Sequence, residues 1–137
     1  MSDTTGIPWD ALVTFVYARD LDAMDRFYGE VCGLKLALDQ GSCHIFEVRP
    51  GAYLGVCQCE DAPETSGVII TLVSDDVDGW YERFIEADVP CEDAPKLNER
   101  FGIYHFFARD PGGWRVEIQR FVDPPLPGVG RSGSASP

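Results

Sequence analysis

The same order of secondary-structure signals occurs twice along this chain. An apolar run rich in β-branched and aromatic residues, Ala11–Ala18, precedes an amphipathic stretch, Leu21–Cys32, so the sequence predicts a strand followed by a helix. Asp20 or Asp22 is placed to accept a hydrogen bond from the first free backbone N–H groups of that helix. Three strands are predicted after it, at Lys35–Asp39, Cys43–Val48 and Ala52–Gln58.

The second pass has the same form. A strand is predicted at Val68–Val73 and a helix at Asp76–Ala87. Three more strands are predicted near Val89–Cys91, Gly102–Ala108 and Trp114–Arg120. The sequence therefore predicts an α+β fold of two tandem βαβββ modules.

The two passes can be aligned residue by residue. Asp20 aligns with Asp76, an offset of 56 that also places Val13 over Ile69. The Pro-Gly turns of the later hairpins align at an offset of 61, which matches His44 with His105. The five extra residues of the second pass are assigned to the loop at 93–101.

Length and composition indicate one globular domain. With 137 residues, 45% of them hydrophobic, the chain can bury a core without stabilisation by disulfides or metal ions. We expect a lead at 1–10, a domain at 11–121 with modules at about 11–60 and 67–121, and a Pro-, Gly- and Ser-rich flexible tail at 122–137.

The charge restricts the kinds of partner. A formal charge of −12 repels phosphate backbones and anionic lipid, so neither nucleic acid nor membrane is an expected partner. No basic leader or long apolar span occurs, which predicts a cytoplasmic protein. The five cysteines lack CxxC spacing and are expected to be free thiols in a reducing compartment: Cys32, Cys43, Cys57, Cys59 and Cys91.

Two segments resemble a known superfamily. Val13–Leu34 is similar to the opening of glyoxalases, bleomycin-resistance proteins and extradiol dioxygenases, the vicinal-oxygen-chelate superfamily, and Asp110–Ile118 is similar to its closing hairpin. The resemblance implies paired modules whose curled mixed sheets surround a cleft, with helices outside, and it implies a homodimer.

The resemblance also implies four metal-ligand positions, in the first and last strands of each module. They correspond to Val13, Val56, Ile69 and Glu117, and the three aliphatic side chains have no lone pair to offer. We therefore expect no cofactor and no metal at the usual site. A divalent metal remains an alternative only if it is displaced to His44, His105 and Glu117. Packed histidines are the simpler interpretation.

Strand alternation assigns faces to these side chains. The cleft is expected to be apolar and aromatic on one side, with an Arg-Glu-Gln ladder on the other, and a collapsed cleft or a dimer interface is the alternative. The predicted ligand-binding residues are Phe15, Tyr17, Leu54, Gln58, Thr71, Arg115, Glu117 and Gln119. The opposite face, expected to pack under helices, includes Leu12, Val16, Ile70, Leu72, Val116 and Ile118.

Three functions fit this pattern. The first is binding of a small organic molecule, cationic or aromatic, without the usual metal, similar to sequestration by bleomycin-resistance proteins. The second is an enzyme, a lyase, isomerase or dioxygenase with a displaced metal or with acid-base catalysis by Glu117 and His105, or by Glu117 with Arg115. The third is a dimeric accessory module with a filled cleft. The sequence does not decide whether the chain is an enzyme.

Overall fold

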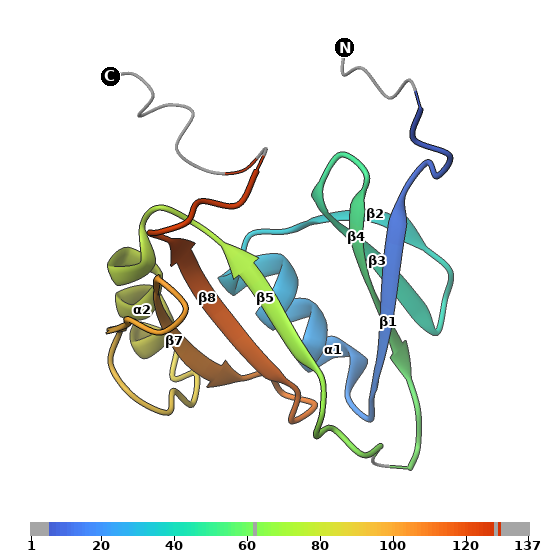
Figure 1. The fold of residues 1–137 in the computed structure, drawn as a ribbon. Helices are drawn as coiled ribbons and strands as arrows, with labels where there is room; N and C mark the ends of the chain where they lie inside the picture. Colours follow the sequence, from blue (N-terminus) through green and yellow to red (C-terminus); the bar gives the residue numbers. More distant parts are fainter. Residues whose placement is uncertain (1–5, 62, 128, 130–137) are drawn as a thin grey trace. The chain divides into compact units, whose positions relative to one another are not determined.

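The computed structural model describes residues 6–61, 63–127 and 129, so parts of the predicted lead and tail lie outside the described residues. The chain divides into two compact units, residues 1–63 and 64–137, and each contains one four-stranded mixed sheet and its helical segment (Figure 1). The predicted α+β fold of two βαβββ modules is confirmed. Within the described residues, no helix is long and apolar enough to cross a membrane.

The first unit has strand order β1-β4-β3-β2. β1 pairs with β4 in parallel, and the other pairs are antiparallel. Its elements are β1 (Leu12–Ala18), α1 (Leu21–Asp25), the π-helical segment η1 (Arg26–Val31), β2 (Lys35–Asp39), β3 (Cys43–Arg49) and β4 (Ala52–Gln58).

The helix of the first unit begins as predicted and then widens. Asp20 is the cap, and its Oδ1 accepts a hydrogen bond from the Ala23 N–H at 2.9 Å. From Arg26 the backbone is π-helical, with the Cys32 N–H donating to the Phe27 carbonyl. The consecutive residues Phe27 and Tyr28 are both buried in this segment, with ring centroids 4.7 Å apart.

The second unit repeats the arrangement with order β5-β8-β7-β6. Asp76 caps its helix, since its Oδ1 accepts from the Gly79 N–H at 3.0 Å. β5 and β8 are parallel. The elements are β5 (Ile69–Val73), α2 (Val77–Glu86), β6 (Lys96–Asn98), β7 (Ile103–Arg109) and β8 (Arg115–Phe121).

The strand predicted near Val89–Cys91 is wrong. That segment makes one isolated bridge, between Cys91 and Ala108, and the edge strand is β6 instead. Asp88 has a left-handed backbone with φ of 60°, and Pro90 has no N–H to donate. The segment therefore cannot begin a regular ladder.

Each sheet has one face covered by its helix. Val16, Phe46 and Val56 are buried on this face of the first sheet, and the Phe46 ring lies 6.4 Å from that of Tyr28. In the second sheet the Phe106 ring packs against Phe84 of α2 at 5.5 Å. Val116 and Ile118 are buried as predicted, but Leu12, predicted for the covered face, is 69% exposed.

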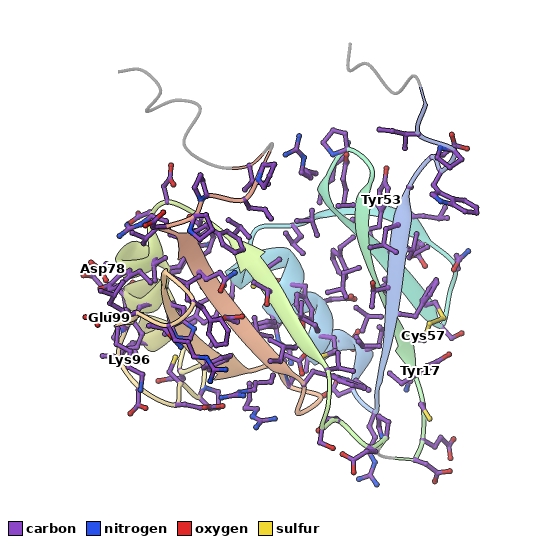
Figure 2. All side chains as sticks on the ribbon, viewed as in Figure 1. Tyr17, Tyr53, Cys57, Asp78, Lys96 and Glu99 are labelled. Carbon is purple, nitrogen blue, oxygen red and sulfur yellow. A yellow bond between two sulfur atoms is a disulfide. The ribbon has the colours of Figure 1, made fainter. Side chains whose placement is uncertain are left out.

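We call the other side of each sheet its open face. In the first sheet it carries the residues Val13, Phe15, Tyr17, Tyr53, Gly55, Cys57, Cys43 and Ile45, since cross-strand partners share a face. In the second it carries Ile69, Thr71, Val73, Arg115, Glu117, Gln119, His105 and Phe107. Figure 2 labels Tyr17 and Cys57, which are partners on β1 and β4.

The predicted faces of β4 are wrong by one residue. Phe15 pairs with Gly55, whereas Thr71 pairs with Glu117, so the counterpart of Glu117 is Gly55 and not Val56. The error comes from aligning the Pro-Gly turns at an offset of 61, whereas the strand pairing aligns Gly55 with Glu117 and Cys57 with Gln119 at an offset of 62. Alternation then places Leu54, Val56 and Gln58 on the side opposite to the one predicted.

The prediction of five free cysteines is also wrong. Cys43 and Cys57 are cross-strand partners with Cα atoms 4.0 Å apart, and they form a disulfide. Cys59 and Cys91 are free thiols, and Cys32 is buried. Spacing along the chain could not reveal this pair, because the β3–β4 register brings together residues 14 positions apart.

A double-mutant cycle tests the register of β1 and β4. A Cβ atom at Gly55 would overlap the Phe15 ring, so we expect Gly55→Ala to lower the free energy of unfolding by about 1–2 kcal/mol. In a Phe15→Ala background, Gly55→Ala should change the free energy of unfolding little. Urea unfolding of the wild type, the two single variants and the double variant measures the coupling energy between the two positions. Equal costs in both backgrounds would contradict the face assignment.

Candidate functional site

Glu117 lies at the centre of the second sheet's open face. Its side chain is 10% exposed, and both carboxylate oxygens have partners. The Thr71 hydroxyl on β5 donates to Oε1 at 2.9 Å, and Nδ1 of His105 on β7 lies 2.6 Å from Oε2. A buried carboxylate would be costly without such partners, so the two neighbouring strands stabilise its charge.

His105 and Gln119 are cross-strand partners beside this carboxylate. They are 6% and 7% exposed, respectively. The His105 ring also contacts Phe107 edge-on, with centroids 5.0 Å apart. His105 therefore faces the same side as Glu117, as the acid-base alternative requires.

Arg115 forms the edge of the same cluster. Its guanidinium lies over the Phe107 ring, 3.6 Å from the centroid, and donates two hydrogen bonds to Glu92 at 2.8 and 2.9 Å. These bonds lower the pKa of Glu92 and raise that of Arg115. Arg109 adds a second cation 3.8 Å from Glu92. Arg115 thus pairs with Glu92 rather than with Glu117.

The open face of the first sheet is apolar and aromatic. Phe15 and Tyr17, both predicted ligand-binding residues, are 45% and 47% exposed there. Leu54 is buried on the helix-covered face instead, and Gln58 follows the same alternation at the end of β4. An open hollow of about 760 Å³ also lies in this unit, but its lining includes none of the predicted site residues: Ile7, Trp9, Asp10, Ala11, Leu12, Pro50 and Gly51.

His44 belongs to the other face of its sheet. Its Nδ1 lies 2.8 Å from Oδ1 of Asp25 on α1, and its Nε2 lies 3.3 Å from Oδ1 of Asp39 on β2. The hydrogen bond to Asp25 is the main cause that raises the pKa of His44. The counterpart of His105 is therefore Cys43, since Cys43 pairs with Cys57 as His105 pairs with Gln119.

The four usual ligand positions do not fit a divalent cation. Val13 and Ile69 are on open faces but carry only hydrocarbon, Val56 is buried under the helix, and its open-face neighbour Gly55 has no side chain. One carboxylate with two protein hydrogen bonds is a poor donor set for such ions. Within the described residues, no group of three or more His, Cys, Asp or Glu side chains could hold a metal ion.

The fold of two repeated βαβββ units defines a class of protein, and comparison with known families identifies that class. The model of the glyoxalase/bleomycin resistance protein/dioxygenase superfamily matches residues 11–118. The chain belongs to this superfamily, and the resemblance seen in the sequence is confirmed. No curated protein matches it.

Solved structures share the fold. A lactoylglutathione lyase from Agrobacterium tumefaciens is 28% identical, with a TM-score of 0.65 over 82% of this chain and 95% of that one. A glyoxalase/bleomycin resistance protein/dioxygenase from Nocardioides is 19% identical, with a TM-score of 0.70 over 90% of each chain. TioX from Micromonospora sp. ML1 is 18% identical, with a TM-score of 0.69 over 83% of this chain and all of that one.

Sequence reasoning missed two members of the cluster. Phe107 could have been found, because alternation along β7 places it on the face of His105. Glu92 lies outside the strands, and no pattern in the sequence connects it with Arg115. The predicted residues Thr71, Arg115, Glu117, Gln119 and His105 share one face of one sheet.

Stability should depend on pH through His44. Because its pKa in the folded protein is raised above 6.5, its contribution is complete below that pH and is lost as the pH rises through the raised value. Urea unfolding across this range should show the free energy of unfolding falling with pH in the wild type and falling less in His44→Gln. An identical slope in the two proteins would contradict this role.

Proposed function

We propose that the open face of the second sheet binds a small, partly aromatic organic molecule without the divalent metal usual in the superfamily. The polar groups of the site are Glu117, His105, Gln119 and Arg115. The apolar ring of Phe107 and the exposed side chains of Ile69 and Val73 share this face. Few polar groups among apolar ones are typical of small-molecule sites.

The hydrogen bonds of Glu117 carry the proposal. In metal-using relatives the corresponding carboxylate is a ligand, whereas here one oxygen accepts from Thr71 and the other faces His105. The Thr71 hydroxyl and the His105 imidazole stabilise the charge of Glu117, as the bound metal ion does in those relatives. The similarity to a lactoylglutathione lyase supports the fold, and no activity is carried over from it, because three of the four usual ligand positions in this chain have no donor atom.

The local charges are balanced rather than acidic. Two arginines, Arg115 and Arg109, stand against two glutamates, Glu92 and Glu117, so the cluster itself does not reproduce the overall charge of −12. We therefore favour an aromatic, uncharged ligand over a cationic one. Sequestration is the biological role most consistent with binding that needs no metal.

Metal removal tests the proposal directly. Purified protein should contain no stoichiometric metal, and its melting temperature should be the same with EDTA and with Mn²⁺, Ni²⁺, Zn²⁺ or Fe²⁺. Aromatic compounds that raise the melting temperature should do so equally in EDTA. Glu117→Gln should cost about 1–3 kcal/mol of stability through its buried hydrogen bonds, whereas exposed Glu86→Gln should not.

The opposite result is equally clear. A stoichiometric metal that is retained in Glu86→Gln and lost in Glu117→Gln would contradict metal-independent binding. It would move the protein to the metal-dependent enzymes of its superfamily.

The contact between His105 and Glu117 favours a second function, acid-base catalysis. A carboxylate that accepts from Nδ1 orients the imidazole and leaves Nε2 to exchange a proton with a bound molecule. Arg115, the other candidate partner of Glu117 in acid-base catalysis, is hydrogen-bonded to Glu92 instead. His105 is therefore the residue that we assign to proton transfer in this alternative.

Proton exchange in D₂O tests this alternative. Small carbonyl compounds with acidic C–H bonds should gain deuterium faster with the protein, and His105→Gln should lose about 10²–10⁴-fold of that rate. NMR measures the exchange, and Glu86→Gln serves as the control. Exchange that persists in His105→Gln would exclude His105 as the base.

A further inference from the structure

Two buried polar side chains on the second sheet have hydrogen-bonding groups to spare. His105 and Gln119 are directly opposite each other on β7 and β8, and each is more than nine-tenths buried. Within the described residues, neither the Gln119 carboxamide nor Nε2 of His105 has a hydrogen-bond partner. Every fully buried side-chain nitrogen or oxygen in that part of the chain does have one, so these groups reach solvent.

Glu117 determines which group donates and which accepts. An ionised carboxylate only accepts, so the short contact with Oε2 places a proton on Nδ1 of His105. In the neutral ring this leaves the lone pair on Nε2. The Gln119 amide supplies N–H donors beside it. The pair therefore offers one acceptor and one donor to a single ligand atom or two adjacent ones.

The surroundings select among ligand classes. A carboxylate could accept from Gln119 but would meet the lone pair of Nε2 and the charge of Glu117 nearby. A cation could donate to Nε2 but would share the face with Arg115. A neutral hydroxyl can donate to Nε2 and accept from Gln119. The neighbouring side chains, Val73 opposite Gln119 and Phe107 against the His105 ring, suit an aromatic ring.

We propose that His105 and Gln119 bind the hydroxyl group of a neutral phenol, which donates to Nε2 and accepts from the carboxamide. The inference rests on the function proposed above for the same face and names the chemical class of its ligand. His105 and Gln119 then orient the bound phenol, and Glu117 fixes the tautomer of His105.

Matched probes test the ligand class. We would measure binding of 4-cyanophenol and 4-cyanoanisole by isothermal titration calorimetry, in EDTA, at a pH at which the phenol is neutral. The methyl ether keeps the aromatic ring but has no hydroxyl hydrogen to donate. We therefore expect its dissociation constant to be at least about tenfold higher than that of the phenol. This comparison needs only the wild-type protein.

Variants connect the preference to the two residues. Gln119→Leu and His105→Gln should each reduce phenol binding by about tenfold and bring it close to that of the ether. Gln40→Leu, an exposed glutamine in a turn, is the matched control and should bind as the wild type does. Circular dichroism and melting temperature confirm that each variant is folded.

Each other outcome overturns the inference in a distinguishable way. Equal binding of phenol and ether would leave the aromatic site standing and remove the hydroxyl subsite. Tighter binding of 4-cyanobenzoate or 4-cyanobenzylammonium would replace the phenol by an anion or a cation. If none of the four compounds binds, the proposed function fails together with the inference.

Discussion

Pairing between the first and last strand of each unit determines the rest of the architecture. β1 joins β4 and β5 joins β8 in parallel, so the strand before the helix lies beside the strand that ends the unit. The helix then covers one face of the sheet, and alternation sends every second side chain to the other. Thr71 reaches Glu117 only because this pairing places them side by side.

Much of this arrangement could be predicted from the sequence. Periodicity and turn signals located all but one of the strands, and Asp20 and Asp76 cap their helices as the repeat implies. The β1 and β5 faces followed from the same alternation. Short strands with clear alternation are what single-sequence reasoning handles best.

The rest depended on contacts that a linear pattern does not contain. The Pro-Gly turns align at an offset of 61, whereas the paired strands align at 62, and this one-residue difference exchanges Val56 for Gly55. The same one-residue difference separates His44 from His105, so that Cys43 is the counterpart of His105. The prediction of a reducing compartment rested on five free thiols, and the disulfide between Cys43 and Cys57 removes that argument. Small errors of register therefore change chemistry more than they change fold.

The disulfide and the polar pair occupy equivalent places in the two sheets. Cys43 and Cys57 are partners where the second sheet has His105 and Gln119. In the first sheet this cross-strand position holds a covalent link, and in the second it holds two polar side chains with hydrogen-bonding groups to spare. Divergence at a single pair of positions could thus make one half of the chain a scaffold while the other half retained the freedom to change its ligand.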